Sequence, residues 1–281
     1  MAILFSALSA LLYGTADFSG GFASRRNAIP AVLIWSQLAG LVMVVLFAIS
    51  DGPSGVTLRD LLWGAAAGLG GMGGLAFLYR GLSRGYVSIV SPLAAVTGAA
   101  VPVFFGLLSG DVIGPVAGAG IAISLPAIVL MSWNRTGAVT HRDPRRLRAS
   151  WLDGGISGVM FGLFFIAISL PAAESGMWPL AAARITSIFV MWTGATLFRR
   201  DRCIAGDHLL VAAAGVLDMG ANIAFVLALR QGALAIVTVI TSAYPAQTVL
   251  LSRVLLRERI GVIRASGIAM ALVGIALMSL G

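Results

Sequence analysis

The chain is built from ten apolar blocks, each about 20 residues long and separated from the next by a short polar link. An apolar helix of about 20 residues crosses the ~30 Å of hydrocarbon in a bilayer, whereas a strand of a membrane barrel needs only ~10 residues and alternates in polarity. The blocks therefore predict an all-α polytopic membrane protein. We expect its ten transmembrane helices at residues 2–22, 29–49, 60–81, 86–108, 112–132, 151–171, 177–198, 208–229, 233–254 and 260–280.

The composition excludes a soluble globular protein. Only 11% of the residues are charged and 59% are hydrophobic, whereas a soluble domain carries about 25% charged residues. All 19 basic residues are arginine, and in a protein with ten spans the net charge of +8 indicates topology rather than a nucleic-acid partner. The single cysteine, Cys203, excludes a disulfide framework. No HExxH or phosphate-loop motif is present, so we expect neither a metal nor a cofactor.

The two halves of the chain resemble each other. A shift of 147 residues superimposes Gly85–Ser132 on Gly232–Ser279 without a gap, and 15 of these 48 positions are identical. The same shift places Asp111 over Glu258, so an acid begins the last helix of each half. Apolar segments match easily through composition alone, but an ungapped match of this length with aligned glycines indicates a duplication.

The duplication defines the expected domain organisation. A first five-helix repeat covers residues 1–132, a basic linker covers 133–150, and a second five-helix repeat covers 151–281. Because five is odd, the second repeat enters the membrane from the opposite side, which makes the repeats inverted. Inverted repeats are typical of secondary transporters, whose substrate binds near the membrane midplane between the repeats.

The arginines are divided unequally between the two sides of the predicted membrane. Sixteen lie in or beside the links that follow the odd-numbered spans, whereas only Arg59 and Arg230 lie on the other side. The positive-inside rule makes the arginine-rich side cytoplasmic and places both termini outside. We expect an integral, multi-pass protein of the bacterial inner membrane.

Four segments carry a pattern shared with known transporters, and they are Leu12-Tyr13-Gly14, Pro179 with Ala183-Arg184, Gly232–Val237 with Tyr244-Pro245, and Leu256–Ile260 with Gly267. With the duplication and the ten spans, the chain resembles the drug/metabolite transporter (DMT) superfamily in its ten-helix, EamA-type form, and within it the YddG-type amino-acid exporters. The resemblance implies a central cavity lined by helices 1–4 and 6–9. The first half departs from the pattern, because Trp35 occupies the place that corresponds to Arg184.

Three ionisable residues, Asp17, Arg184 and Asp218, lie well inside the predicted spans. A charge at mid-bilayer costs ~2.5–3.5 kcal/mol on insertion scales, so such residues usually face the bundle interior or a wet cavity. Arg184 has two interpretations. Its planar fork suits the carboxylate of a substrate, and it is equally suited to an internal ion pair with Asp218.

Two further acid-containing pairs are candidate substrate contacts. Asp218 and Asn222 are four residues apart and share one helix face. They can receive a substrate ammonium group or a transported proton, or form interhelical hydrogen bonds. Asp17 follows Tyr13 by one turn, and its carboxylate either lines the cavity or lies solvated near the membrane surface.

Polar and aromatic residues of the second and ninth spans complete the candidate site. Thr241, Tyr244 and Gln247 lie beside Pro245, which frees the carbonyl of Thr241. A freed carbonyl is tolerated within a membrane where it lines a cavity or gains another partner. The second span contributes Trp35 and Gln37, and Trp35 either stacks on a substrate or faces lipid or the core.

An enzymatic alternative arises from Gly155-Ile156-Ser157-Gly158, which resembles the GxSG of rhomboid intramembrane serine proteases. Such a serine needs an activating histidine. The chain has only His141, in the basic linker, and His208, at the start of a span. We interpret Ser157 as a packing residue.

The sequence thus predicts a secondary transporter, not an enzyme. It is expected to export small metabolites, above all amino acids, by alternating access through a central cavity between the repeats. A multidrug cation exporter is the alternative, and it should depend on an acid more than on Arg184. The expected partners are a small-molecule substrate and the lipid bilayer, and the expected state is a monomer.

Overall fold

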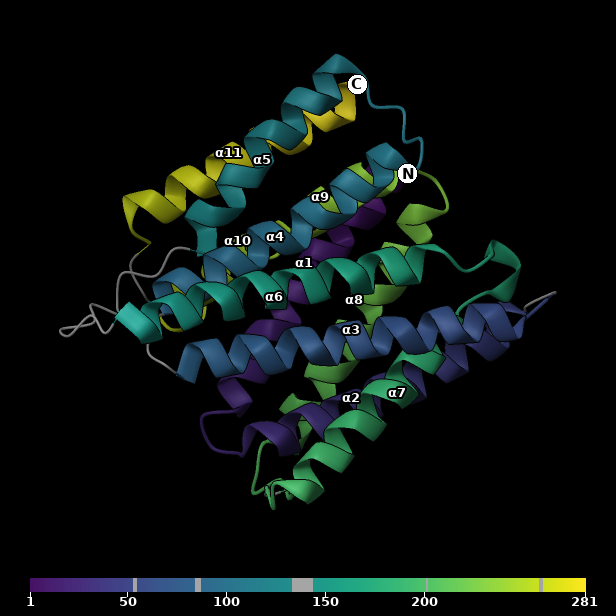
Figure 1. Ribbon diagram of the computed structural model, residues 1–281, viewed down its shortest axis with the longest axis vertical. Helices are drawn as coiled ribbons and strands as arrows, with labels where there is room; N and C mark the ends of the chain where they lie inside the picture. The colour runs from purple at the N-terminus through teal and green to yellow at the C-terminus, as the bar shows by residue number, and fades with distance from the viewer. Residues whose placement is uncertain (53–54, 84–86, 133–143, 201, 258–259) are drawn as a thin grey trace.

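The computed structural model describes residues 1–52, 55–83, 87–132, 144–200, 202–257 and 260–281. The described chain is helical without strands, and ten of its segments are long and apolar enough to cross a membrane, which confirms the predicted fold class (Figure 1). The helices are α1 Ala2–Ala23, α2 Ile29–Asp51, α3 Leu58–Ser83, α4 Val87–Leu108, α5 Pro115–Ser132, α6 Pro144–Ser169, the short 3₁₀ helix η1 Ala173–Ser175, α7 Trp178–Leu197, α8 His208–Leu229, α9 Leu234–Thr241, α10 Pro245–Leu255 and α11 Val262–Leu280.

Two helix borders differ from the sequence prediction. α6 begins at Pro144, inside the expected linker, because proline fits the first turn of a helix, where its missing N–H costs no hydrogen bond. The ninth span is divided into α9 and α10, because Pro245 cannot donate to the helical ladder. The linker residues 133–143, with His141, and the acid Glu258 lie outside the described residues.

Large apolar side chains cover the outside of the molecule. Leu4, Leu8 and Leu11 are exposed along one face of α1, and Phe189 and Trp192 are exposed on α7. Such extensive apolar exposure is rare on soluble monomers. It is the normal state of a helix that faces lipid tails, which are as apolar as leucine.

Helices from the two halves of the chain interleave. α1 has its most extensive interface with α8, α3 lies between α6 and α7, and α2 packs on α7 and α8. α4 packs on α6, and α5 pairs with α11 along one edge of the molecule (Figure 1). The first and second halves therefore form one bundle rather than two separate ones.

Glycines allow these helices to approach closely. A Cβ atom at Gly64 or Gly68 of α3 would strike the backbone of Pro179 or Ala183 in α7. On another face of α3, a Cβ at Gly70 would lie 3.0 Å from the carbonyl oxygen of Met160 in α6. The glycine pairs of α3 thus serve close packing, as small residues commonly do between membrane helices.

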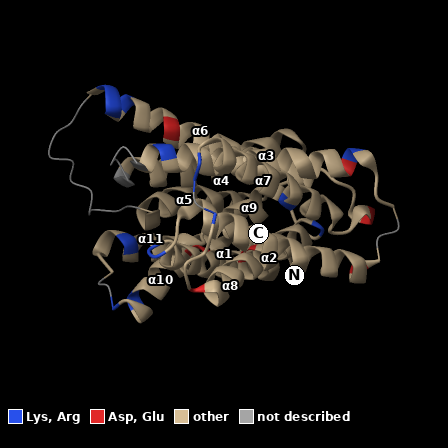
Figure 2. Ribbon diagram, turned by 90° about the horizontal axis from the view of Figure 1, so that it is seen from below, with Lys and Arg blue, Asp and Glu red and all other residues tan. Residues whose placement is uncertain are grey.

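Most of the charged residues lie near the ends of the helices. Both termini lie at one end of the bundle, opposite the end where α5 finishes and α6 begins (Figure 1). Arg145, Arg146 and Arg148 occupy the first turns of α6, and Figure 2 shows further arginines on α10 and α11 at the same end. The arginine excess of the sequence is therefore an excess at one end of the molecule.

We expect both termini to lie outside the cytoplasm, because the arginine-rich end is retained on the cytoplasmic side. A reporter that is active only outside the cytoplasm should be active when fused to Gly281. The same reporter inserted in the link between α5 and α6 should be inactive. A C-terminal fusion that is active only with a cytoplasmic reporter would contradict this topology.

Candidate functional site

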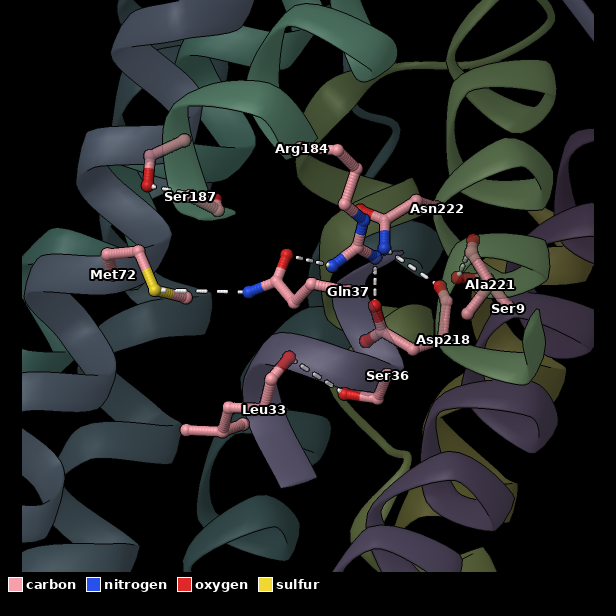
Figure 3. Close-up of polar contacts among 11 residues, drawn as sticks. Ser9, Leu33, Ser36, Gln37, Met72, Arg184, Ser187, Asp218, Ala221 and Asn222 are labelled. Carbon is pink, nitrogen blue, oxygen red and sulfur yellow. Dashed lines mark hydrogen bonds and ion pairs between the residues drawn. The ribbon is translucent and has the colours of Figure 1, made fainter. Parts of the chain in front are cut away.

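A polar cluster lies where α2, α7 and α8 meet (Figure 3). Arg184 of α7 forms an ion pair with Asp218 of α8 through its Nη2 and the Oδ2 of the aspartate. Its Nη1 donates a hydrogen bond to Oε1 of Gln37 in α2, at 2.7 Å. The guanidinium therefore joins the first half of the chain to the second.

The two charges of this pair differ in accessibility. The side chain of Arg184 is 13% exposed, and that of Asp218 is 34% exposed. Buried charges are stable only when they are paired and hydrogen-bonded. The pair satisfies Arg184 within the bundle, and about a third of the Asp218 side chain remains accessible.

Two amides hold the cluster in place. Gln37 is buried, and its Nε2 lies 3.9 Å from the sulfur of Met72 in α3, so its carbonyl end is turned toward Arg184. Asn222 is also buried and donates to the backbone carbonyl of Asp218 at 2.8 Å. Its amide nitrogen is thus used within α8.

Close contact between α2 and α8 brings these side chains together. A Cβ at Gly215 of α8 would strike the backbone of Ser36 in α2, and one at Gly40 would lie 2.9 Å from the carbonyl oxygen of Gly215. The Nε atom of Arg184 would lie 3.6 Å from a Cβ at Gly40. The arginine therefore crosses α2 at a point where that helix has no side chain.

A second group of predicted residues joins α1 to the break between α9 and α10. The rings of Tyr13 and Tyr244 are 6.2 Å apart at an interplanar angle of 57°. Nε2 of Gln247 lies 3.4 Å from Oγ1 of Thr15, and Oγ1 of Thr248 donates to the carbonyl of Gly14 at 3.1 Å. Next to Tyr13, Cδ1 of Leu12 would lie 3.4 Å from a Cβ at Gly220 in α8, so this part of α1 packs against the helix that carries Asp218.

The helix break re-satisfies the carbonyl that Pro245 frees. The oxygen of Thr241 accepts a hydrogen bond from the N–H of Tyr244 at 3.1 Å, within a tight turn over Ser242–Tyr244. The Thr241 side chain is fully buried, and its Oγ1 has no hydrogen-bond partner among the described residues. The structure therefore favours the second reading of this proline, in which the carbonyl gains another partner.

Two predicted residues make no described hydrogen bond or ion pair with the members of the cluster. Asp17 is exposed, one turn after Tyr13 on α1. Trp35 is 49% exposed, and its Nε1 donates to the carbonyl of Arg202 at 2.9 Å, away from the cluster. Neither side chain is brought into contact with Arg184 by a described hydrogen bond or ion pair.

The shift of 147 residues places Gln37, not Trp35, over Arg184. Gly68 faces the backbone of Ala183, and Gly215, which is 147 residues further along, faces the backbone of Ser36. The same shift therefore superimposes Ser36 on Ala183 and the next residue, Gln37, on Arg184. The expected match of Trp35 to Arg184 was therefore two residues off this shift. Apolar helices contain few distinctive residues that could fix their alignment.

The sequence did not reveal two buried acids, Asp60 in the first turn of α3 and Asp153 within α6. Asp60 is 5% exposed and accepts hydrogen bonds from the hydroxyls of Thr57 and Ser175, both at 2.6 Å. Thr57-x-x-Asp60 is close to the sequence pattern of a helix capping box, and this pattern could have identified Asp60.

Asp153 is 1% exposed and pairs with Nη2 of Arg80 at 2.6 Å. It was overlooked because the predicted border at residue 151 placed it at the membrane surface.

The serine of the protease-like motif is a packing residue in the structure. Ser157 is fully buried, and its hydroxyl donates to the carbonyl of Gly74 in α3 at 2.8 Å. Ser157→Ala should therefore leave function unchanged, apart from the loss of one hydrogen bond, worth about 1 kcal/mol. Labelling of Ser157 by a serine-directed probe, together with loss of activity in inserted Ser157→Ala protein, would support the enzyme instead.

Two small cavities lie away from the polar cluster. One, of about 180 Å³, is bordered by the η1 loop, α7 and the end of α8, and includes Pro179 and Arg230. The other, of about 300 Å³, is apolar and lies between α3 and α6, with Trp63 and Met160 in its wall. Neither includes Arg184 or Asp218.

Comparisons with known proteins agree with the membrane fold. Residues 154–280 match the EamA-like transporter family. The fold is similar to that of a protein solved by crystallography. The match covers 99% of this chain and 96% of the other chain, with a TM-score of 0.76 and 18% sequence identity. A likeness at that identity shows the fold alone. No curated protein matches the chain.

Proposed function

Because residues 154–280 form a domain of the EamA-like transporter family, part of the DMT superfamily, we propose that this membrane transporter exports small metabolites, above all amino acids. It would do so by alternating access between two inverted repeats, residues 1–132 and 151–281. The observation that carries the substrate class is the cluster of Arg184, Asp218 and Gln37 within the span region.

The pattern of hydrogen bonds between helices supports the inverted repeat. A shift of 148 residues superimposes Ser9 of α1 on Ser157 of α6. Ser9 donates to the carbonyl of Ala221 in α8, and Ser157 donates to that of Gly74 in α3, both at 2.8 Å. The contact of α1 with α8 thus has its counterpart in the contact of α6 with α3, as a two-fold axis between the halves requires.

The packing of α5 on α11 supports the same symmetry. A Cβ at Gly120 of α5 would lie 2.6 Å from the carbonyl oxygen of Gly274 in α11. A Cβ at Gly267, the equivalent of Gly120, would lie 3.0 Å from the carbonyl oxygen of Ala127. Each helix therefore offers the same surface to the other, which is the signature of a self-complementary two-fold contact.

The contact between Gln37 and Arg184 supports a central position for the proposed substrate site. Residues related by a two-fold axis contact each other only near that axis. The hydrogen bond between these two side chains therefore supports a position of Arg184 close to the axis between the repeats. Transporters with inverted repeats bind their substrates there.

The chemistry of the cluster fits the head group of an amino acid. Arg184 supplies a planar cation with several donors, the preferred partner of a carboxylate. Asp218, directly beside it and one-third exposed, supplies an acceptor for the ammonium group. Tyr13 belongs to α1, which packs on the helix of Asp218, and its ring neighbours that of Tyr244, so the two rings offer aromatic surface to a substrate side chain.

A cation exporter is the second candidate, and Asp17 favours it. Its exposed carboxylate lies one turn from Tyr13, and an acid beside aromatic rings suits a lipophilic cation. In that case, transport would depend on Asp17 and tolerate the loss of the guanidinium at position 184.

Counterflow into proteoliposomes tests the proposal directly. Vesicles containing the purified protein are preloaded with each of the twenty amino acids, or with a few lipophilic cations, and uptake of the labelled compound is followed. We expect accumulation of several amino acids and none of the cations. Accumulation of cations alone would replace the proposal by the second candidate.

A further inference from the structure

The ion pair between Arg184 and Asp218 balances the charge of the proposed site when it is empty. Both residues lie within candidate membrane spans, α7 and α8, and the guanidinium is largely buried. Gln37, its other partner, is neutral. Without the Asp218 carboxylate, the site would therefore hold a cation with no counter-charge in direct contact among the described residues.

We infer that Asp218 is an internal counter-ion that replaces the substrate carboxylate on Arg184 after release, so that the empty transporter can reorient without cargo. This inference rests on the proposed function. An uncompensated charge is costly inside a bundle and inside a membrane. A carrier left with a bare Arg184 would be slow to return and would be limited to exchanging one substrate for another.

The loaded site has the same charge as the empty one when the substrate is a zwitterion. The substrate carboxylate takes the place of Asp218 on Arg184, and the substrate ammonium takes the place of Arg184 on Asp218. The charges of Arg184, Asp218 and the substrate add up to zero both before and after the substrate binds. Both forms can then cross between their two orientations, and net export needs no counter-substrate.

The neighbouring amides suit such an exchange of partners. The bond from Nη1 of Arg184 to Gln37 is independent of Asp218, so it holds the guanidinium while its other partner changes. Asn222 bonds to the backbone of Asp218 and not to its carboxylate. The carboxylate is also the more exposed member of the pair, so it is the one that a substrate reaches.

Two fluxes measured on the same proteoliposomes test the inference. Vesicles are loaded with an amino acid that is active in counterflow. Its net efflux into amino-acid-free buffer is then compared with its exchange against the same external amino acid. The wild type should show both. In Asp218→Asn the substrate ammonium also loses its partner, so exchange should fall as well. Net efflux should fall about tenfold further, because the charge left over in the empty form is the largely buried guanidinium, whereas in the loaded form it is the ammonium at the more exposed position. A tenfold difference between the two fluxes corresponds to ~1.4 kcal/mol. Asp218→Glu should restore the ratio toward that of the wild type.

Asp51→Asn is the matched control, because it removes the acid of another ion pair. Asp51 lies 3.7 Å from Arg230, and these side chains are 30% and 27% exposed, at the other end of the bundle from the arginine-rich segments. This variant should keep the wild-type ratio. If Asp218→Asn cannot be recovered in folded form, the inference is tested on the wild type. Because its loaded and empty forms carry the same charge, its net efflux should not respond to a membrane potential set with potassium and valinomycin.

Several outcomes overturn the inference. Equal loss of both fluxes in Asp218→Asn would make Asp218 a binding group only. A wild type that exchanges amino acids without net efflux, or whose net efflux follows the membrane potential, would overturn the inference and leave the proposed function intact. A wild type without either flux for any amino acid would overturn both.

Discussion

Arg184→Lys is expected to insert and fold normally and to lose most amino-acid transport. Lysine keeps the charge, and therefore the attraction to Asp218, but it loses the planar fork that reaches Gln37 and a second acceptor at once. Hydrogen bonds to charged groups contribute ~1.5–3 kcal/mol, so the rate should fall roughly tenfold to a hundredfold at 1.4 kcal/mol per factor of ten. Counterflow of the purified variant measures the loss, and unaltered elution from a sizing column checks the fold.

Arg230→Lys provides the matched control for this substitution. Arg230 also pairs with an aspartate, Asp51, but at the end of α8 and away from the cluster. It should retain transport. Full activity of Arg184→Lys would show that position 184 needs only a charge, as expected if its role is to pair with Asp218.

Removal of both charges separates function from structure. Arg184→Ala alone leaves Asp218 without its partner, and a broken buried pair costs ~3–5 kcal/mol in soluble proteins, so poor expression of that variant is expected. Arg184→Ala with Asp218→Ala should recover folding but not transport. Recovered folding with normal amino-acid transport would mean that the pair is structural and that the proposed substrate site is wrong.

Gly215→Val is expected to prevent recovery of stable protein. The glycine lies in the middle of α8, and a Cβ there would collide with the backbone of Ser36 in α2. A backbone cannot move aside as a side chain does, so the penalty should exceed the ~1–3 kcal/mol of ordinary overpacking. Yield after solubilisation and the apparent melting temperature in detergent measure the effect.

The control for this substitution is Gly194→Val in α7. No atom outside its own turn lies within 4 Å of a Cβ at that position. Both variants replace a helical glycine by valine, so a large difference between them reports the contact with α2. Equal stability of the two variants would contradict the close packing of α2 on α8.

The sequence was sufficient for the helices but not for their exact ends. Apolar blocks of membrane-spanning length leave little choice of secondary structure, and all ten spans are present. Hydrophobicity does not mark borders where a helix continues into polar sequence, so the two turns of α6 before Trp151 were expected as linker. Pro245 did signal a disturbance, but not that α9 would end a full turn before it.

The sequence identified members of the site better than it identified their partners. Arg184 and Asp218 stood out because charges are rare within apolar blocks, and their pairing was one of two interpretations. The bond of Arg184 to Gln37 was not foreseen, because the alignment of the repeats in α2 placed Trp35 at that position. To recognise Asp153 as buried, one needs the correct first residue of α6. No local sequence pattern reveals that the partner of Asp153 is Arg80, on a different helix.

The interleaved packing has a consequence for biosynthesis. α1 leaves the ribosome before the second half of the chain is made, yet its most extensive interface is with α8, and α3 must wait for α6 and α7. The early helices therefore reside in the bilayer with their small-residue faces covered by lipid until the second half is made. Folding is completed only when late helices displace that lipid, so a nascent chain stopped before α8 should remain protease-sensitive and unable to assemble, however many of its helices have been inserted.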